Sequence, residues 1–214
     1  MKRGASAERW PTQLQQGLIA LGLELTPGQQ RKLCDYLALL QKWNRAYNLT
    51  AVRDVAELVP RHLLDSLAIL PFLQGSRALD VGTGAGLPGI PLAVACPERS
   101  FTLLDANGKK TRFVQQAKME LGLGNVEVVQ MRAEEYRPDV HYPTVVARAF
   151  AALPQIWDWV AHLLAPGGLL LAMKGSLPEA EIAELVDRGV AVEVQPLAVP
   201  GIDGQRHALL CRRA

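Results

Sequence analysis

Cysteine is scarce in this sequence, and long apolar runs are missing from it. Three cysteines stand far apart among 214 residues, and no CxxC pair is present. This spacing excludes the usual zinc ligand pattern and a disulfide framework, so we expect reduced thiols and no bound metal. No apolar run approaches the roughly 18 residues of a membrane helix, and the first charged residues have no apolar stretch behind them. We therefore expect a cytoplasmic protein. The cysteines are Cys34, Cys96 and Cys211.

The charge balance is close to neutral, and a net charge of +2 is weak evidence for an anionic partner. The distribution is more informative, because residues 107–119 hold four cations and no acid, whereas residues 178–194 are mostly acidic. Such asymmetry is compatible with a basic face for a nucleic acid. Each run, taken alone, fits a solvated helix face equally well.

Residues 1–75 have the pattern of a helical segment. Residues 26–29, Thr-Pro-Gly-Gln, have the spacing of a capping box with proline at the first helical position. The apolar residues that follow recur every three or four positions, which predicts an amphipathic helix. Further helices are expected over 13–21 and 54–70, the second interrupted at Pro60. The apolar stripe consists of Leu33, Tyr36, Leu37, Leu40 and Trp43.

From residue 77 onward, short apolar runs alternate with helical stretches, which predicts a parallel sheet covered on both faces. The last two runs, 190–197 and 207–212, are joined without a helix and should pair antiparallel. We expect an α/β fold with a seven-stranded, Rossmann-like core over 76–214, forming one compact unit with the helical extension over 1–75. The other strands are expected at 77–81, 101–105, 126–129, 144–148 and 169–174, with helices at 88–95, 109–121, 153–163 and 178–186.

The most specific local signal is a glycine-rich loop at residues 78–89, ALDVGTGAGLPG. It follows the first expected strand and leads into the first helix of the sheet. Gly82, Gly84 and Gly86 allow a tight turn and the close approach of a ligand to the backbone. The helix N-terminus behind them favours a negatively charged group such as a carboxylate. Ligands of open α/β sheets bind at the carboxyl ends of the strands, so we expect a ligand at this loop.

The glycine spacing is compatible with two kinds of ligand. It matches the GxGxxG fingerprint of dinucleotide-binding proteins, but that match alone is weak. Asp80 stands just before the glycines, where a carboxylate would repel a pyrophosphate, and this segment resembles motif I of S-adenosylmethionine methyltransferases. Asp105 ends the next strand and suits ribose hydroxyls of either ligand. Ala133 and Glu134 follow the third strand, where they can meet an adenine, although a solvated turn fits equally well.

The acceptor of a methyl group determines which side chains are required, because transfer needs a nucleophile in line behind the methyl. The Asn-Pro-Pro-aromatic run typical of exocyclic-amine methylation is missing after the fourth expected strand. A Pro-Cys nucleophile for pyrimidine C5 is missing too, since Cys96 precedes Pro97. Guanine N7 is a free acceptor without a proton, so its methylation needs no general base. The sequence is consistent with that acceptor and does not single it out.

Three longer motifs resemble the bacterial 16S ribosomal RNA guanine-N7 methyltransferases, a family also called glucose-inhibited division protein B. They are residues 40–50, LQKWNRAYNLT, residues 61–66, RHLLDS, and residues 80–92, DVGTGAGLPGIPL. The resemblance implies S-adenosylmethionine as cofactor, N7 of a guanosine as acceptor, and 16S rRNA or the 30S subunit as partner of a monomer. Ala106 departs from the pattern, which has serine there, and this removes one polar contact to ribose. Shorter matches lie at 101–105, 148–151, 173–175 and 206–207.

The resemblance also implies site residues, carried over position by position. Arg148 ends the fourth strand beside the expected methyl group, and it is a candidate for cofactor contact and for catalysis. Lys174, which ends the fifth strand, is a similar catalytic candidate. Arg206 and His207 open the last strand near the same rim, and for His207 a structural role is favoured. The candidate cofactor contacts are Gly82, Leu87, Ala133, Glu134 and Arg148 by resemblance, and Asp80, Gly84, Gly86 and Asp105 by the physical reasoning above.

The helical segment over 1–75 is the expected RNA-binding element, because cations can hold phosphates and aromatic rings can stack on unpaired bases. Trp43 lies on the apolar stripe, so we expect it in the core and the cations on the RNA. Three alternatives stay open: a methyltransferase for a small molecule or protein, an NAD-binding oxidoreductase, and a non-catalytic RNA-binding protein with this fold. The cations are Arg31, Lys32, Lys42, Arg45, Arg53 and Arg61, interleaved with Trp43 and Tyr47.

Overall fold

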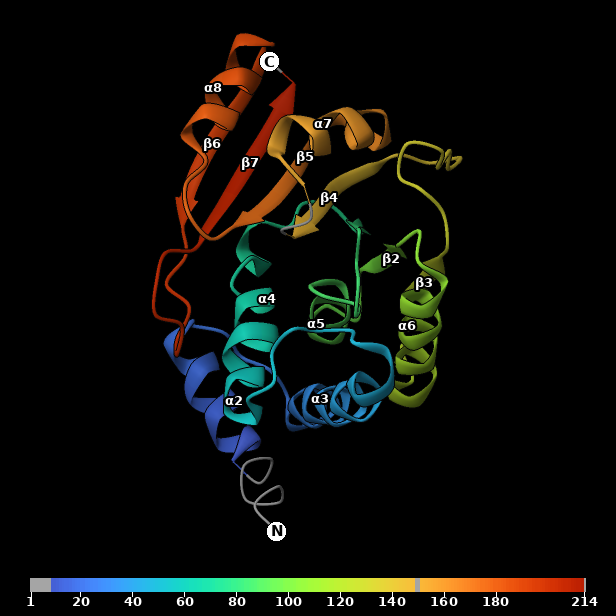
Figure 1. Ribbon diagram of the computed structural model, residues 1–214, viewed down its shortest axis with the longest axis vertical. Coiled ribbons are helices and arrows are strands. Elements are labelled where there is room, and N and C mark those ends of the chain that lie inside the picture. Colours follow the sequence, from blue (N-terminus) through green and yellow to red (C-terminus); the bar gives the residue numbers. More distant parts are fainter. Residues whose placement is uncertain (1–8, 149–150, 214) are drawn as a thin grey trace.

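A twisted seven-stranded sheet forms the centre of the molecule in the computed structural model, which describes residues 9–148 and 151–213 (Figure 1). The strand order is β3-β2-β1-β4-β5-β7-β6. The first five strands are parallel, and β7 pairs antiparallel with both β5 and β6. The strands are β1 Arg77–Val81, β2 Ser100–Leu104, β3 Val126–Val129, β4 Tyr142–Arg148, β5 Leu164–Lys174, β6 Val190–Pro196 and β7 His207–Arg213.

The α/β class, the seven strands and the reversed last strand confirm the sequence prediction. The position of β7 between β5 and β6 was not predicted. The helical crossover after β5 places β6 at the edge of the sheet, one strand position away from β5. The chain then turns back, and β7 fills the position between β5 and β6. Because β7 runs against β5, it brings its first residue beside the end of β5, where His207 pairs with Lys174.

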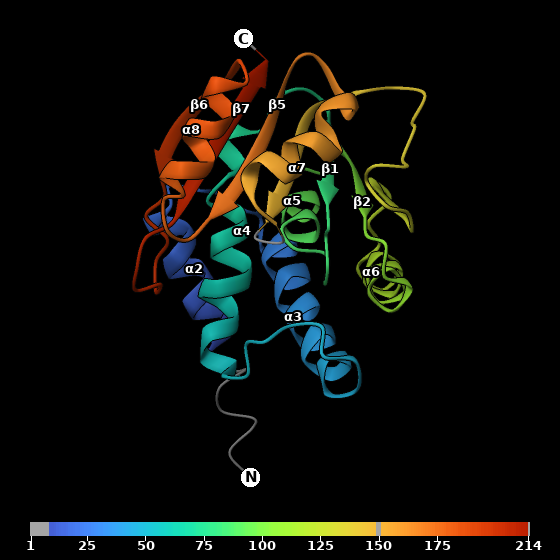
Figure 2. The same cartoon turned by 45° about the horizontal axis from the view of Figure 1, so that its top comes forward.

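Helices cover both faces of the sheet (Figures 1 and 2). One face carries the N-terminal helices together with the helices that follow β1 and β2, and the other carries the helices that follow β4 and β5. The first group is α2 Trp10–Ala20, α3 Pro27–Tyr47, a helical segment with α4 Asp65–Leu67, α5 Gly89–Ala95 and α6 Gly108–Leu121, and the second is α7 Leu153–Val160 and α8 Glu179–Asp187.

The helix α3 forms as its sequence predicts. The Thr26 side chain accepts from the Gln29 backbone N–H, and the Gln29 side chain accepts from the Thr26 backbone N–H, which completes the capping box. The helix ends at Asn48, a C-cap in the left-handed conformation. Trp43 packs against the core, as expected, with its ring centroid 5.6 Å from that of Phe113 on α6. The helix is thereby fixed along the first face of the sheet.

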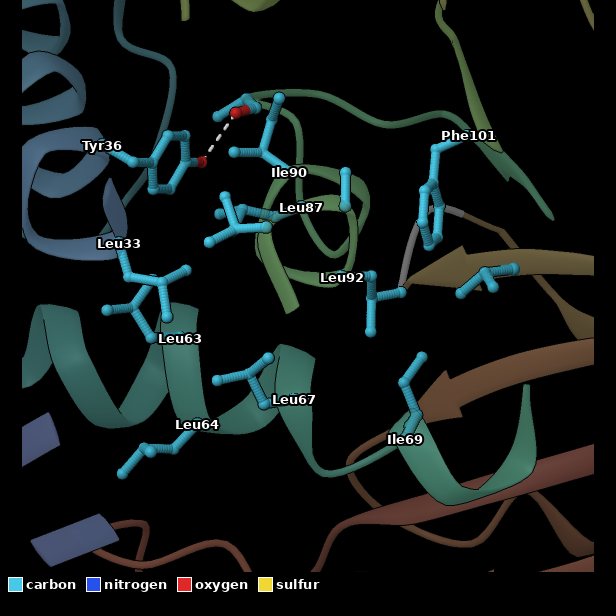
Figure 3. Packing of buried hydrophobic residues seen from close by; sticks show 14 of the residues in the cluster. Leu33, Tyr36, Leu63, Leu64, Leu67, Ile69, Leu87, Ile90, Leu92 and Phe101 are labelled. Carbon is cyan, nitrogen blue, oxygen red and sulfur yellow. Dashed lines mark hydrogen bonds between the residues drawn. The ribbon is translucent and has the colours of Figure 1, made fainter. Parts of the chain in front are cut away.

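The N-terminal helices and the sheet share one apolar core. Leu33 of α3 and Leu63 of the following helical segment lie beside Leu87 of the glycine loop and Ile90 of α5 (Figure 3). The Tyr36 hydroxyl donates a 2.7 Å hydrogen bond to the backbone oxygen of Ala85 within the loop (Figure 3). The helical extension therefore supports the glycine loop directly.

The expected interruption at Pro60 does not occur. The chain stays helical through a 3-10 turn at Val55–Glu57, a π-helical stretch at Val59–Leu64 and α4. Pro60 stands in the first turn of the π-helical stretch, where a missing N–H disturbs the hydrogen-bond pattern least. His62, in the π-helical stretch, and Asp65, at the start of α4, are both buried.

Candidate functional site

The glycine loop leaves the end of β1 in a conformation that requires glycine. Gly82, Gly84 and Gly86 all have positive φ angles, of 65°, 60° and 83°. Below the loop, Asp80 accepts hydrogen bonds from the Thr83 hydroxyl at 2.6 Å and from the Gly89 backbone N–H at 2.8 Å. These contacts fix the conformation of the loop from its buried side, and its other side remains free to contact a ligand.

Asp80 is buried, and one of its two oxygens lacks a partner. Its Oδ1 has no hydrogen bond within the described part of the chain. Burial raises the pKa of this carboxyl to about 7, although the bonds from Thr83 and Gly89 oppose the shift. A buried acceptor without a donor is unfavourable, and it indicates that a bound group or a water supplies one.

A cavity of about 250 Å³, here called the loop cavity, lies at the ends of β1, β2 and β3. Asp105 forms part of its wall, and its two oxygens accept from the backbone N–H groups of Gly84 at 2.9 Å and Asn107 at 2.8 Å. Lys110 lies 3.8 Å from the same carboxylate. The lining residues are Val81, Gly82, Leu104, Asp105, Ala106, Lys110, Met131, Arg132, Ala133, Glu134 and Trp159.

A second cavity of about 460 Å³, here called the strand-end cavity, lies at the ends of β4 and β5 and the start of β7. Asp65 is buried in its wall and forms ion pairs with Arg148, at 3.4 Å, and with Arg206, at 3.2 Å. Lys174 donates to Glu181 and to the backbone oxygen of Ala151, both at 3.0 Å. The lining residues are Val52, Arg61, His62, Asp65, Arg148, Met173, Lys174, Gly175, Leu197, Arg206 and His207.

His62 is the one buried imidazole in the strand-end cavity. Its Nε2 lies 2.9 Å from the Thr50 hydroxyl, and its Nδ1 has no partner in residues 9–148 or 151–213. Burial and the nearby Arg148 guanidinium lower the pKa of His62 from 6.5 to about 4. The imidazole is therefore neutral at neutral pH.

The structure divides the predicted site residues into three groups. Gly82, Asp105, Ala133 and Glu134 line the loop cavity, and Arg148 and Lys174 line the strand-end cavity. The predicted residues Asp80, Gly84, Gly86 and Leu87 belong to the loop and its support. Leu87 packs into the core, and a Cβ at Gly86 would lie 2.5 Å from Ile90.

Sequence reasoning missed two residues of the strand-end cavity, Asp65 and His62. Both stand in an otherwise apolar helical run with Leu63, Leu64 and Leu67, and all five side chains are buried. A carboxylate and an imidazole inside such a run are unusual, because charged groups are seldom fully buried without a partner. This irregularity was the available signal.

The strand order, the reversed last strand and a glycine loop between two strand-end carboxylates define the class of S-adenosylmethionine-dependent methyltransferases. Solved structures with this fold include the glycopeptide N-methyltransferase MtfA complexed with S-adenosyl-L-methionine, with a TM-score of 0.63 at 13% identity over 72% of this chain and 87% of that chain. The DhpI-SAM-HEP complex has a TM-score of 0.56 at 17% identity, over 88% of this chain and 100% of that chain.

The family is narrower than the class. A sequence model of rRNA small subunit methyltransferase G, also named GidB, matches residues 29–210. A protein of that name from Marinobacter nauticus is 53% identical over 209 residues, 98% of each chain. Another from Pseudomonas syringae pv. tomato is 50% identical over 94% of this chain and 95% of its own. The chain belongs to the rRNA small subunit methyltransferase G family, which confirms the predicted resemblance.

Residues 9–148 and 151–213 lack two features that bear on possible partners. They contain no helix long and apolar enough to cross a membrane. They also contain no group of three or more histidine, cysteine, aspartate or glutamate side chains arranged to hold a metal ion.

Proposed function

We propose that the protein transfers the methyl group of S-adenosylmethionine to N7 of a guanosine in 16S ribosomal RNA. The observation that carries the proposal is the adjacency of the two cavities. Val81 pairs with Ala147 in the sheet, so Gly82 of the loop cavity and Arg148 of the strand-end cavity are the next residues along neighbouring strands. The loop cavity suits a nucleoside that donates a methyl group, and the strand-end cavity suits an anionic acceptor. The two cavities meet at this edge of the sheet.

The loop cavity fits S-adenosylmethionine, which supplies a methyl group bound to a sulfonium. Asp80 lies under the glycine loop and not in the cavity lining, and its unpartnered Oδ1 is an acceptor of the kind that an ammonium group requires. Asp105 would hold the ribose hydroxyls, and Ala133 with Glu134 would border the adenine. A dinucleotide fits less well, because its pyrophosphate would lie above the buried Asp80 carboxylate.

The strand-end cavity would receive the guanosine. Guanine N7 has a free lone pair and no proton to lose, so the residues need only bind and orient the base. Arg148 and Arg206 offer N–H donors to phosphate or base oxygens, and Lys174 adds a third cation that Glu181 holds in place. These roles make Arg148 and Lys174 the first candidates for mutation.

The helical extension would bind the surrounding RNA. The ring of Tyr47 packs against that of Trp43, with the two ring centroids 5.2 Å apart. Tyr47 is nevertheless 46% exposed, so its ring is accessible for stacking on a base. Arg31, Lys42 and Arg45 are exposed and form no ion pair within the described ranges. Such cations are available to phosphates. We propose a monomer that acts on the ribosomal subunit in the cytoplasm, as the family resemblance implies.

The test uses undermethylated 30S subunits, naked 16S rRNA and S-adenosylmethionine with a labelled methyl group. Selective cleavage at N7-methylguanosine, followed by primer extension, maps the modified nucleotide. The proposal expects one labelled N7-methylguanosine in the 16S rRNA from at least one substrate, with transfer that weakens steeply as salt rises. A label on another atom would overturn the N7 assignment, and an absence of label in both substrates would overturn the enzyme.

A further inference from the structure

The Asp65 carboxylate connects two arginines that come from distant parts of the chain. Arg148 ends β4, Arg206 directly precedes β7, and Asp65 begins α4. We propose that Asp65 is a positioning residue, which holds both guanidinium groups at the orientation that receives the target nucleotide. This inference rests on the proposed function, because it assigns the strand-end cavity to the acceptor.

The geometry of the contacts supports a positioning role. Asp65 Oδ2 accepts from Arg148 Nη1 at 3.4 Å, and its Oδ1 accepts from Arg206 Nε at 3.2 Å. Each arginine has one further bond to a backbone oxygen, Arg148 to Arg61 at 3.3 Å and Arg206 to Gln205 at 2.9 Å. A guanidinium has more N–H donors than these contacts use. Within residues 9–148 and 151–213 the remaining donors of both arginines have no hydrogen-bond partner, and both side chains line the cavity.

The charges explain why a carboxylate is needed at this position. Two guanidinium groups that share a cavity repel each other, and partial burial strengthens the repulsion. The arginine side chains are only 22% and 26% exposed, and the Asp65 side chain is 9% exposed. Without the carboxylate, the two cations would lose their common partner and turn toward solvent. Asp65 thus keeps two cations side by side for an anionic nucleotide.

A purely structural reading of Asp65 makes a different prediction. If the ion pairs only attached α4 to the sheet, their loss would lower stability and would disturb the glycine loop, which packs on the same core. Affinity for S-adenosylmethionine would then fall together with turnover. A positioning role affects the acceptor steps and leaves the loop cavity intact.

The experiment measures kcat and KM for undermethylated 30S subunits, together with S-adenosylmethionine affinity by calorimetry. We expect Asp65→Asn to lower kcat/KM for 30S subunits by about 30-fold or more, with cofactor affinity within about twofold of wild type. The matched control is Asp158→Asn, which removes an exposed carboxylate paired with Arg188. We expect that variant to behave as wild type.

A double-mutant cycle with Arg206→Gln distinguishes the positioning role of Asp65 from a purely structural role. If Asp65 acts through Arg206, adding Asp65→Asn to Arg206→Gln should lower kcat/KM by much less than it does in the wild-type background. Additive losses, or an unchanged kcat/KM in Asp65→Asn, would overturn the inference. Asp65→Glu keeps the negative charge, so its kcat/KM should lie between those of Asp65→Asn and the wild-type protein. If Asp65→Asn does not fold, Asp65→Glu takes its place in the cycle. Failure of the wild-type protein to methylate 16S rRNA would instead overturn the proposed function.

Discussion

The two cavities are built in different ways from the same sheet. The loop cavity takes most of its residues from the ends of three adjacent strands, in residues 81–82, 104–106, 110 and 131–134, and one, Trp159, from α7. The strand-end cavity gathers Val52, the helical segment with His62 and Asp65, and residues as distant as His207. It is also the larger, at about 460 Å³ against 250 Å³. On the proposed assignment, donor recognition would rest on a local sequence pattern, whereas acceptor recognition would depend on tertiary assembly.

The comparison implies that each cavity can be damaged separately, and the largest effect is expected in the loop cavity. Gly82 has a φ of 65°, which a β-branched residue adopts only with strain. We expect Gly82→Val to weaken S-adenosylmethionine binding by about 1000-fold, with RNA binding retained. Calorimetry with cofactor and a filter assay with 30S subunits measure the two.

Gly122→Val is the matched control for backbone strain. Gly122 caps α6 with a φ of 62° and lines neither cavity. This variant should lose stability in the same way and keep cofactor affinity. Equal losses of affinity in the two variants would show that strain, and not contact with the cofactor, explains the first result.

The second prediction concerns the neutral His62 in the strand-end cavity. Its pKa is lowered from 6.5 to about 4, so its contribution to stability is complete above pH 6.5 and is lost as pH falls toward 4. At about 1.4 kcal/mol per unit the loss approaches about 3 kcal/mol. Urea unfolding of both proteins across this range should show this loss as a change in the difference between the free energy of unfolding of the wild-type protein and that of His62→Gln.

Asp80 provides an internal check on that measurement. Its pKa is raised to about 7, so its unfavourable contribution is complete above pH 7 and is relieved as pH falls toward 3.8. This effect has the opposite sign and is present in both proteins, and it cancels when the two unfolding free energies are subtracted. A difference that does not change between pH 6.5 and 4 would contradict a buried neutral His62.

The third prediction concerns a substitution that should affect the strand-end cavity and leave the loop cavity unchanged. Arg148→Ala removes a cation that pairs with Asp65, and we expect kcat/KM for 30S subunits to fall by about 100-fold. Cofactor affinity should stay within about twofold of wild type, because Arg148 does not line the loop cavity. Wild-type turnover would exclude Arg148 from the acceptor site, and lost cofactor affinity would mean that the cavities are not separable.

The smallest effect is expected from Asp105→Asn. The substitution removes the charge that would strengthen a bond to the ribose, so we expect cofactor affinity to fall by about tenfold. Asp105 also accepts from the Gly84 N–H, and the amide oxygen preserves one such bond. Calorimetry measures the change, and an affinity equal to that of wild type would place the ribose elsewhere.

The same contrast explains what could be predicted from sequence. The strands, the helices between them and the glycine loop follow from local periodicity and turn chemistry, and the structure contains all of them, although β5 begins at Leu164 and not at Leu169. The insertion of β7 and the continuous helix through Pro60 depend on tertiary packing, which local patterns do not encode.

The site follows the same division. Gly82, Asp105, Ala133 and Glu134 were predicted, and they lie together in the loop cavity because each follows a strand of one parallel sheet. Whether they contact the cofactor stays a prediction. Asp65 was missed because its partners Arg148 and Arg206 lie far away in sequence, and only folding brings the three together.

A crystal structure of the protein soaked with S-adenosylmethionine tests the division of the two cavities most directly. We predict the adenosine in the loop cavity between Asp105 and Ala133, with the sulfonium at the boundary beside Gly82 and its methyl group directed toward the Arg148 side. Electron density for the adenosine in the strand-end cavity, or a loop cavity without cofactor at saturating concentration, would contradict it.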